Sequence, residues 1–212
     1  MPNILTFVPR LAVMLAITTP LLAGAQQQQS KRSQFVITKG KDTVAVELFS
    51  RDGNALTSEI YQTNGPRTQY TMDLKPDSSI SHVEFTRVTQ NNQSIGISIF
   101  FLDSTVKAQM SAQGQTEQLE FSSRKAIPML TVSFALCEQI VHASHLGVGQ
   151  SATYTAIRLG AGDTTQLAVT RFHKDSVSFV MQGAQLKAVL GTKGEIVGGV
   201  HLGQGWTITR KP

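Results

Sequence analysis

From Gln34 onward, apolar and polar residues alternate with a period of two, which is typical of strands with one buried face. Runs rich in Val, Ile, Thr and Phe are separated by turn signals about every 8–12 residues. In "FVITKGKDTVAVELF", for example, the turn Lys39–Asp42 separates two β-branched runs, as in a hairpin. The pattern predicts about eight strands before residue 123 and about six from residue 150 onward.

One segment, residues 128–146, breaks this alternation. Pro128 suits the first turn of a helix, and Gly147 suits a position just past its end. We therefore expect one amphipathic helix over residues 128–146. At about 100° per residue, its apolar side consists of Leu130, Phe134, Cys137 and Val141, widened by Met129, Leu136 and Ile140.

These elements predict a mainly β fold, in which a long curved antiparallel meander or incomplete barrel packs around the helix at residues 128–146. A sheet of many strands needs closure or a covering element to bury one face and protect its edges. We expect a single β-rich domain over residues 34–212, with a first meander at 34–123 and a second at 150–212. Whether the two meanders form one sheet or two stays open.

The N-terminus has the features of a signal peptide, which we place at residues 1–25. Arg10 precedes the apolar run Leu11–Leu22, and small residues follow up to Ala25. The run is shorter than the roughly 20 residues of a membrane span, so cleavage near Ala25 is favoured over a retained anchor. Residues 26–33 then form a flexible leader. We expect a periplasmic or secreted protein with no integral membrane span after cleavage.

Composition narrows the classes of partner and the sources of stability. The chain has one cysteine, Cys137, so an exported form has no internal disulfide and depends on packing. The formal net charge is +5, which permits contact with anionic lipid or polymer. The lysines and arginines are scattered singly along the chain, however, which indicates solvated faces and argues against a nucleic-acid partner.

The segment "LCEQIVHASH" is the most chemically suggestive in the chain, because Glu138, His142 and His145 occur within eight residues of one another. Two histidines and a carboxylate form a known zinc ligand set. The zincin pattern His-Glu-x-x-His is absent, however, and Glu138 can support His142 at i+4. We interpret the three residues as the polar, solvated side of the helix, and expect no metal site and no cofactor.

Catalytic motifs are missing elsewhere. No Gly-x-Ser-x-Gly elbow occurs. The glycines of "LGTKGEIVGG" lie among predicted strands, where glycine marks turns and bulges rather than phosphate loops. We therefore assign no catalytic residue and expect a protein that is not an enzyme.

A resemblance rests on three segments: "IPMLTVSFALCEQIV", "KDSVSFVMQGAQLKAVLGTKGEIVGG" and the closing "GWTITR". Together they resemble a group of uncharacterised exported bacterial proteins, over roughly residues 34–212. Their architecture is similar to that of periplasmic lipoprotein carriers and related half-barrels. The resemblance implies a curved antiparallel sheet that wraps a helix and leaves an apolar cavity, and it carries no assigned catalytic residue.

The first functional hypothesis is a periplasmic binding or carrier module for a lipid or other hydrophobic ligand. An alternative is a structural or interaction module of the cell envelope with a protein partner. A second alternative is a hydrolase or metal-dependent enzyme. For the first hypothesis, the expected ligand-binding residues are Leu130, Phe134, Cys137 and Val141 of the helix, beside Phe100 and Phe179 of the strands.

Overall fold

The chain forms strands and a single helix in the part that the structure describes. The computed structural model describes residues 32–123 and 125–211. Strands β1–β8 precede residue 123 and β10–β15 begin at residue 150, as the alternation predicts. The elements are β1 (Ser33–Lys39), β2 (Asp42–Asp52), β3 (Ala55–Gln62), β4 (Arg67–Leu74), β5 (Ile80–Val88), β6 (Ser94–Phe101), β7 (Thr105–Ala112), β8 (Gln115–Ser122), β9 (Ala126–Met129), α1 (Phe134–Ser144), β10 (Gln150–Arg158), β11 (Asp163–His173), β12 (Ser176–Met181), β13 (Ala184–Leu190), β14 (Ile196–His201) and β15 (Trp206–Lys211).

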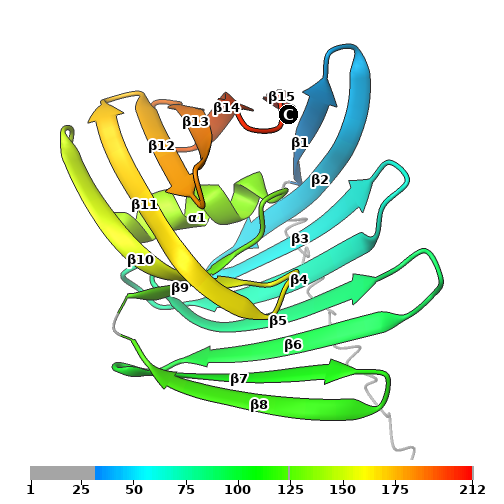
Figure 1. The fold of residues 1–212 in the computed structure, drawn as a ribbon. Helices are drawn as coiled ribbons and strands as arrows, with labels where there is room; N and C mark the ends of the chain where they lie inside the picture. Colours follow the sequence, from blue (N-terminus) through cyan, green and yellow to red (C-terminus); the bar gives the residue numbers. More distant parts are fainter. Residues whose placement is uncertain (1–31, 124, 212) are drawn as a thin grey trace, which may run out of the picture.

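The two meanders form one sheet of fifteen strands, in the order β8-β7-β6-β5-β4-β3-β2-β1-β15-β14-β13-β12-β11-β10-β9. Strand β1 pairs antiparallel with β15, and this pair joins the N-terminal meander to the C-terminal one. Strand β9 departs from the antiparallel pattern, because it pairs parallel with β10. The end strands β8 and β9 are not neighbours, so the sheet is strongly curved but open (Figure 1).

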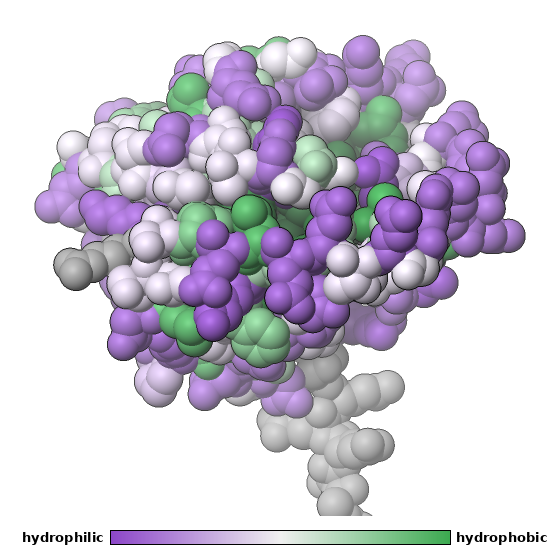
Figure 2. All heavy atoms as spheres, turned by 60° about the horizontal axis from the view of Figure 1, so that its bottom comes forward, coloured by the Kyte–Doolittle hydropathy of each residue, from purple (hydrophilic) through white to green (hydrophobic). Residues whose placement is uncertain are grey.

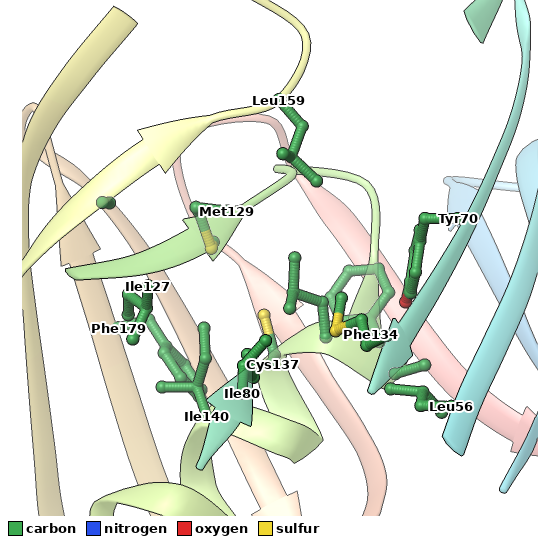
Figure 3. Packing of buried hydrophobic residues seen from close by; sticks show 14 of the residues in the cluster. Leu56, Tyr70, Ile80, Ile127, Met129, Phe134, Cys137, Ile140, Leu159 and Phe179 are labelled. Atoms are coloured by element: carbon green, nitrogen blue, oxygen red, sulfur yellow. The ribbon is translucent and has the colours of Figure 1, made fainter. Parts of the chain in front are cut away.

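The alternating sequence gives each strand one face toward the core. In β4, Thr68, Tyr70, Met72 and Leu74 are buried, and the residues between them are exposed. The buried faces line the concave side of the sheet, and α1 lies within this curve (Figure 1). Helix and sheet residues thereby share one hydrophobic core (Figure 3).

The helix is shorter than predicted, and the expectation that it begins at Pro128 was wrong. Pro128 belongs to β9, an end strand of the sheet, where a residue without an N–H is tolerated. The helix begins after Ser133, whose Oγ accepts a hydrogen bond from Leu136 N at 3.2 Å. Its last residue is Ser144 instead of the predicted residue 146, and His145, which has a left-handed conformation, is the C-cap.

The expected signal peptide, residues 1–25, lies outside the described residues, as does most of the leader at 26–33. Within residues 32–123 and 125–211, no helix has the length and apolar character needed to span a membrane.

Candidate functional site

A buried carboxylate holds the N-terminus of α1. Glu47, on the concave face of β2, is fully buried. Its Oε2 accepts hydrogen bonds from Phe134 N at 2.6 Å and Ala135 N at 3.1 Å, and its Oε1 accepts three from hydroxyl groups. These hydroxyls are Ser133 Oγ at 2.6 Å, Ser58 Oγ at 2.8 Å and Tyr70 OH at 3.2 Å.

Burial raises the pKa of Glu47, and the hydrogen bonds from Ser133, Ala135, Ser58 and Phe134 oppose that shift. A carboxylate at this position also complements the positive end of the helix dipole. The donors leave no room for a substrate at this carboxylate, so we interpret Glu47 as the anchor of the helix.

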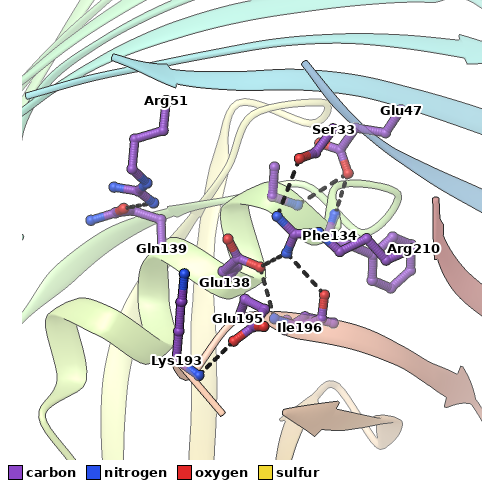
Figure 4. A network of polar contacts seen from close by, with 11 residues as sticks. Ser33, Glu47, Arg51, Phe134, Glu138, Gln139, Lys193, Glu195, Ile196 and Arg210 are labelled. Carbon is purple, nitrogen blue, oxygen red and sulfur yellow. Dashed lines mark hydrogen bonds and ion pairs between the residues drawn. The ribbon is translucent and has the colours of Figure 1, made fainter. Parts of the chain in front are cut away.

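A second buried contact ties α1 to the last two strands. Glu138 Oε2 accepts hydrogen bonds from Arg210 Nη1 at 2.6 Å and from Ile196 N at 2.7 Å (Figure 4). The Arg210 guanidinium also lies over the rings of Phe35 and Phe49, 5.5 and 5.0 Å from their centroids. Glu138 is therefore an internal ion-pair partner.

The expectation that Glu138 lies on a solvated helix face was thus wrong, since its side chain is buried against β14 and β15. The neighbouring Gln139 is also fully buried, and its Oε1 accepts a hydrogen bond from Arg51 at 2.5 Å. The helix packs on almost all sides because the sheet curves around it. Periodicity along the helix does not contain this information.

The histidines of the same segment point to different parts of the protein. His145 Nε2 lies 3.0 Å from the Asp77 carbonyl oxygen, while His142 lies near Gly194 and is half-buried, so desolvation lowers its pKa. Over residues 32–123 and 125–211, no group of three or more His, Cys, Asp or Glu side chains is placed to hold a metal ion. Cys137 is fully buried, which raises the pKa of its thiol.

An open space lies where the two ends of the sheet approach each other. Strands β8 and β9 are consecutive along the chain but do not pair, and we call the space between them the seam. A pocket of about 290 Å³, the seam pocket, opens there. Its apolar lining includes Phe101, Leu102, Ile127, Ile140, Ala143 and Tyr154, and its rim includes Lys75, Asp103 and Lys125.

A second pocket, of about 160 Å³, lies further along the inner face of the N-terminal meander, and we call it the strand pocket. It is lined by Ile97, Ala108, Met110, Glu117, Gln118, Leu119, Ile157 and Gly162. Leu119, on the end strand β8, is 45% exposed. Figure 2 brings the β8 side of the molecule forward and shows apolar surface between polar side chains.

The two pockets are related through β8. Residues two apart on a strand share a face, so Leu119 and Phe121 follow one another along the inner side of β8, and Ser123 comes directly after the strand. Leu119 lines the strand pocket, Ser123 lines the seam pocket, and the partly buried Phe121 lies between them. The side chains of Leu119 and Phe121 form a short apolar strip along β8, which leads from the strand pocket toward Ser123 at the seam pocket.

The structure separates the residues predicted to bind a ligand. Phe134 and Cys137 are fully buried in the core, Val141 is buried, and Leu130 packs partly buried beside them. The seam pocket instead meets the helix at Ile140 and Ala143.

The two predicted strand residues also differ from each other. Phe100 lies on the outer face, 48% exposed and stacked on His82 at 4.3 Å, so the expectation that it lines a ligand cavity beside the helix residues was wrong. Phe101, the next residue, lines the seam pocket. Ile97, Ile99 and Phe101 alternate along β6 and are all buried, so this alternation predicts that Phe101, rather than Phe100, lies on the inner face. Phe179 lines a separate pocket in the C-terminal meander.

No family model matches the sequence, and no curated protein matches it significantly. Among solved structures, the chain is similar to a DUF1089 family protein from Pseudomonas aeruginosa, with a TM-score of 0.54 and 11% sequence identity. The match covers 74% of this chain and 89% of that chain. At such low identity the likeness shows the fold alone.

Proposed function

We propose that this protein is an exported, non-enzymatic binding or carrier module for a lipid or another hydrophobic molecule. The observation that carries the proposal is the apolar strip along the seam, where Leu119 remains 45% exposed on the inner side of an end strand. Burying apolar surface is favourable by about 25 cal/mol per Å². An apolar chain laid along this strip would provide that burial.

The shape of the site favours an elongated amphiphile. Strands β8 and β9 are not paired, so an apolar chain that enters between them breaks no hydrogen bonds between paired strands. Lys75 and Lys125 lie at the rim of the seam pocket with Asp103, whose Oδ1 is 3.9 Å from Lys75 Nζ. These charges keep a polar head group in contact with water while the chain lies inside.

The likeness to lipoprotein-carrier half-barrels supports this proposal only as an analogy of architecture. The signal-peptide features of residues 1–25 support export to the periplasm or beyond. Neither the architectural likeness nor the signal peptide depends on the geometry of the pockets, so ligand binding can be tested separately from both.

The proposal is tested by native mass spectrometry of residues 26–212, purified gently from an exporting host. We expect an added mass of lipid size that is lost on denaturation. A fluorescent fatty acid titrated into the delipidated protein then measures affinity. Ala108→Trp, which fills the strand pocket, should weaken binding about tenfold or more.

The matched control is Gln109→Trp, which adds the same side chain to the exposed outer face of β7. It should leave affinity unchanged. A bare mass together with a flat titration of the unmutated protein would overturn the proposal, as would equal losses in the two variants.

A second candidate, a protein-interaction module, is favoured by β8 itself. This strand ends the sheet, and all but one of its residues are exposed, so its free backbone groups can pair with another strand. A protein without bound lipid that sediments as an oligomer would favour this candidate, provided that Gln118→Lys on β8 lowers the sedimenting mass.

A further inference from the structure

Five neighbouring strands of the sheet, β1, β15, β14, β13 and β12, contain no aspartate or glutamate. They lie in the upper part of Figure 1, where β1 and β15 join the two meanders. Lys187 of β13 and Lys211 of β15 are exposed on the outer face, whereas Arg210 turns inward to Glu138. The outer face of these five strands is therefore positively charged.

Acidic residues are concentrated elsewhere in the molecule. The first meander, residues 34–123, contains ten acidic and seven basic residues, whereas residues 150–212 contain three acidic and seven basic residues. Asp175 and Glu195 lie in the turns before β12 and β14, and both accept local hydrogen bonds, from Ser176 Oγ and Lys193 N. The two meanders thus carry opposite net charges.

The outer face of the same strands also presents valines to solvent, and we call it the valine face. Val189 on β13 is 48% exposed, and Val197 and Val200 on β14 are 39% and 38% exposed. Val200 pairs with Lys187 and Val189 pairs with Gly198, so these residues lie side by side. A solvated strand face ordinarily carries polar residues, as β4 does with Arg67, Gln69, Thr71 and Asp73.

The valine face continues across the sheet beyond β14. Gly198 pairs with Thr209, Thr209 pairs with Val36, and Val36 pairs with Val46. This row, from Val189 on β13 to Val46 on β2, contains no charged residue. Single exposed valines are ordinary on a protein surface, but a continuous apolar row indicates a surface that something covers.

Charge decides what fits on the valine face. A second copy placed symmetrically on it would bring lysines of the two copies together, which is unfavourable. A soluble polyanion would pair with the lysines but leave the valines in water. A bilayer that contains anionic phospholipid offers an apolar layer and phosphates together, and lysine can reach a phosphate while its methylene stem stays on apolar surface.

We propose that the valine face docks the protein on a bilayer that contains anionic phospholipid. Val189, Val197 and Val200 contact the lipid, and Lys187 and Lys211 lie at the phosphates. This docking goes beyond the binding of a single lipid molecule, because none of these residues lines the seam pocket or the strand pocket. The valine face lies near the middle of the strand order, whereas the seam lies between its two ends.

The test is co-sedimentation with vesicles, using the protein purified from the exporting host as above. Phosphatidylcholine vesicles with about one third phosphatidylglycerol are compared with pure phosphatidylcholine at about 0.1 M salt. Two lysines at the surface predict at least about tenfold tighter binding to the anionic vesicles, and weaker binding at about 1 M salt. No binding to the anionic vesicles, or equal binding to both kinds, would overturn the proposal.

Two charge-reversal variants locate the contact. Lys187→Glu places a negative charge beside Val200 and should weaken binding to the anionic vesicles about tenfold or more. Lys107→Glu makes the same change on the exposed outer face of β7, in the first meander, and should change binding by less than about twofold. Equal losses in the two variants would show that only net charge matters, and would contradict the proposal.

Two valine variants test the apolar part of the contact. Val189→Thr keeps the β-branched shape and the charge but places a hydroxyl group at the lipid, so affinity should fall about threefold. Val148→Thr, at a position that is 58% exposed between α1 and β10, should leave affinity unchanged. An unchanged affinity of Val189→Thr would contradict a contact between the valines and the lipid.

Two further measurements separate the other occupants. Soluble polyglutamate, at the same concentration of charge, should leave most of the protein on the vesicles. Full displacement would assign the valine face to an acidic polypeptide. Without vesicles, an oligomer that Lys187→Glu dissociates would assign it to a second copy, and either result would overturn the proposal.

The lipid-binding proposal and this one can fail separately. Lys187→Glu should leave the fluorescent fatty-acid titration unchanged, because Lys187 lines neither pocket at which the fatty acid is proposed to bind. Ala108→Trp should leave vesicle binding unchanged, because Ala108 lines the strand pocket on the inner face. Loss of vesicle binding in Ala108→Trp would show that the seam, rather than the valine face, holds the membrane.

Discussion

The two ends of α1 meet the surrounding sheet in different ways. At the N-terminal end, residues 134–137 are almost fully buried, and Glu47 accepts two backbone hydrogen bonds there. Toward the C-terminal end, Ile140 and Ala143 border the seam pocket. Directional polar contacts fix the position of the helix at one end. Because the helix is held at its N-terminal end, the apolar side chains near its C-terminal end can line the seam pocket.

The largest effect should come from breaking the N-terminal anchor. Glu47→Leu leaves the N–H groups of Phe134 and Ala135 buried without an acceptor. It also removes the acceptor of the Ser58 hydroxyl, whereas the hydroxyls of Tyr70 and Ser133 still hydrogen-bond to each other at 2.7 Å. We expect a loss of about 3–5 kcal/mol in the free energy of unfolding, measured by denaturant titration. Glu59→Leu, on the neighbouring strand β3, should cost at most about 1 kcal/mol. Similar losses in both variants would show that Glu47 is no special anchor.

A smaller loss should follow from Arg210→Met. This change leaves the carboxylate of Glu138, which is 5% exposed, with Ile196 N as its remaining donor. We expect about 3 kcal/mol of destabilisation. Lys211→Met, at the exposed next position, is the control. In a double-mutant cycle with Glu138→Gln, strict additivity would argue against a coupled pair.

Replacing an alanine by leucine near each end of the helix compares the space that is available around the two side chains. Ala135 is 1% exposed in the core, so Ala135→Leu should cost about 1–3 kcal/mol through overpacking. Ala143 borders the seam pocket, so Ala143→Leu should change stability by less than about 0.5 kcal/mol and weaken fatty-acid binding. Thermal unfolding and the fluorescent titration measure both effects. Equal destabilisation would mean that the seam pocket is not usable space.

The smallest effect concerns pH. Burial lowers the pKa of His142, so the unfolded chain binds a proton at a higher pH than the folded chain does. Stability should therefore fall as the pH drops below about 6.5, the ordinary value for histidine. Glu138 and Glu195 oppose this shift, whereas Arg51 and Arg210 reinforce it.

His142→Gln should make the unfolding free energy less dependent on pH between about pH 7 and 5, because the titrating group is gone. His173→Gln, at an exposed position, should leave the pH dependence unchanged. An identical pH profile for His142→Gln and the unmutated protein would contradict the prediction.

Much of the fold could be predicted because its signals are local. The turn Lys39–Asp42 joins β1 and β2 as the sequence indicates, and the alternation identifies the buried residues of β4. The start of the helix could not be predicted, because Pro128 suits a first helical turn as well as an end strand. Only the pairing of β9 with β10 distinguishes the two.

The candidate site was less predictable than the fold. A helical projection places Ile140 and Phe134 on the apolar side of the helix, but it does not show which of the two side chains borders a pocket.

By itself, the sequence determined a β-rich chain with one helix, the turns between most strands and the face on which most side chains lie. These properties depend on residues close together along the chain. The tertiary structure alone decided that β1 pairs with β15, that Glu47 caps a helix 87 residues away, and that β8 and β9 remain unpaired. Such contacts depend on the accumulated curvature of the whole sheet. The seam and its apolar strip arise where that curvature stops short of closure.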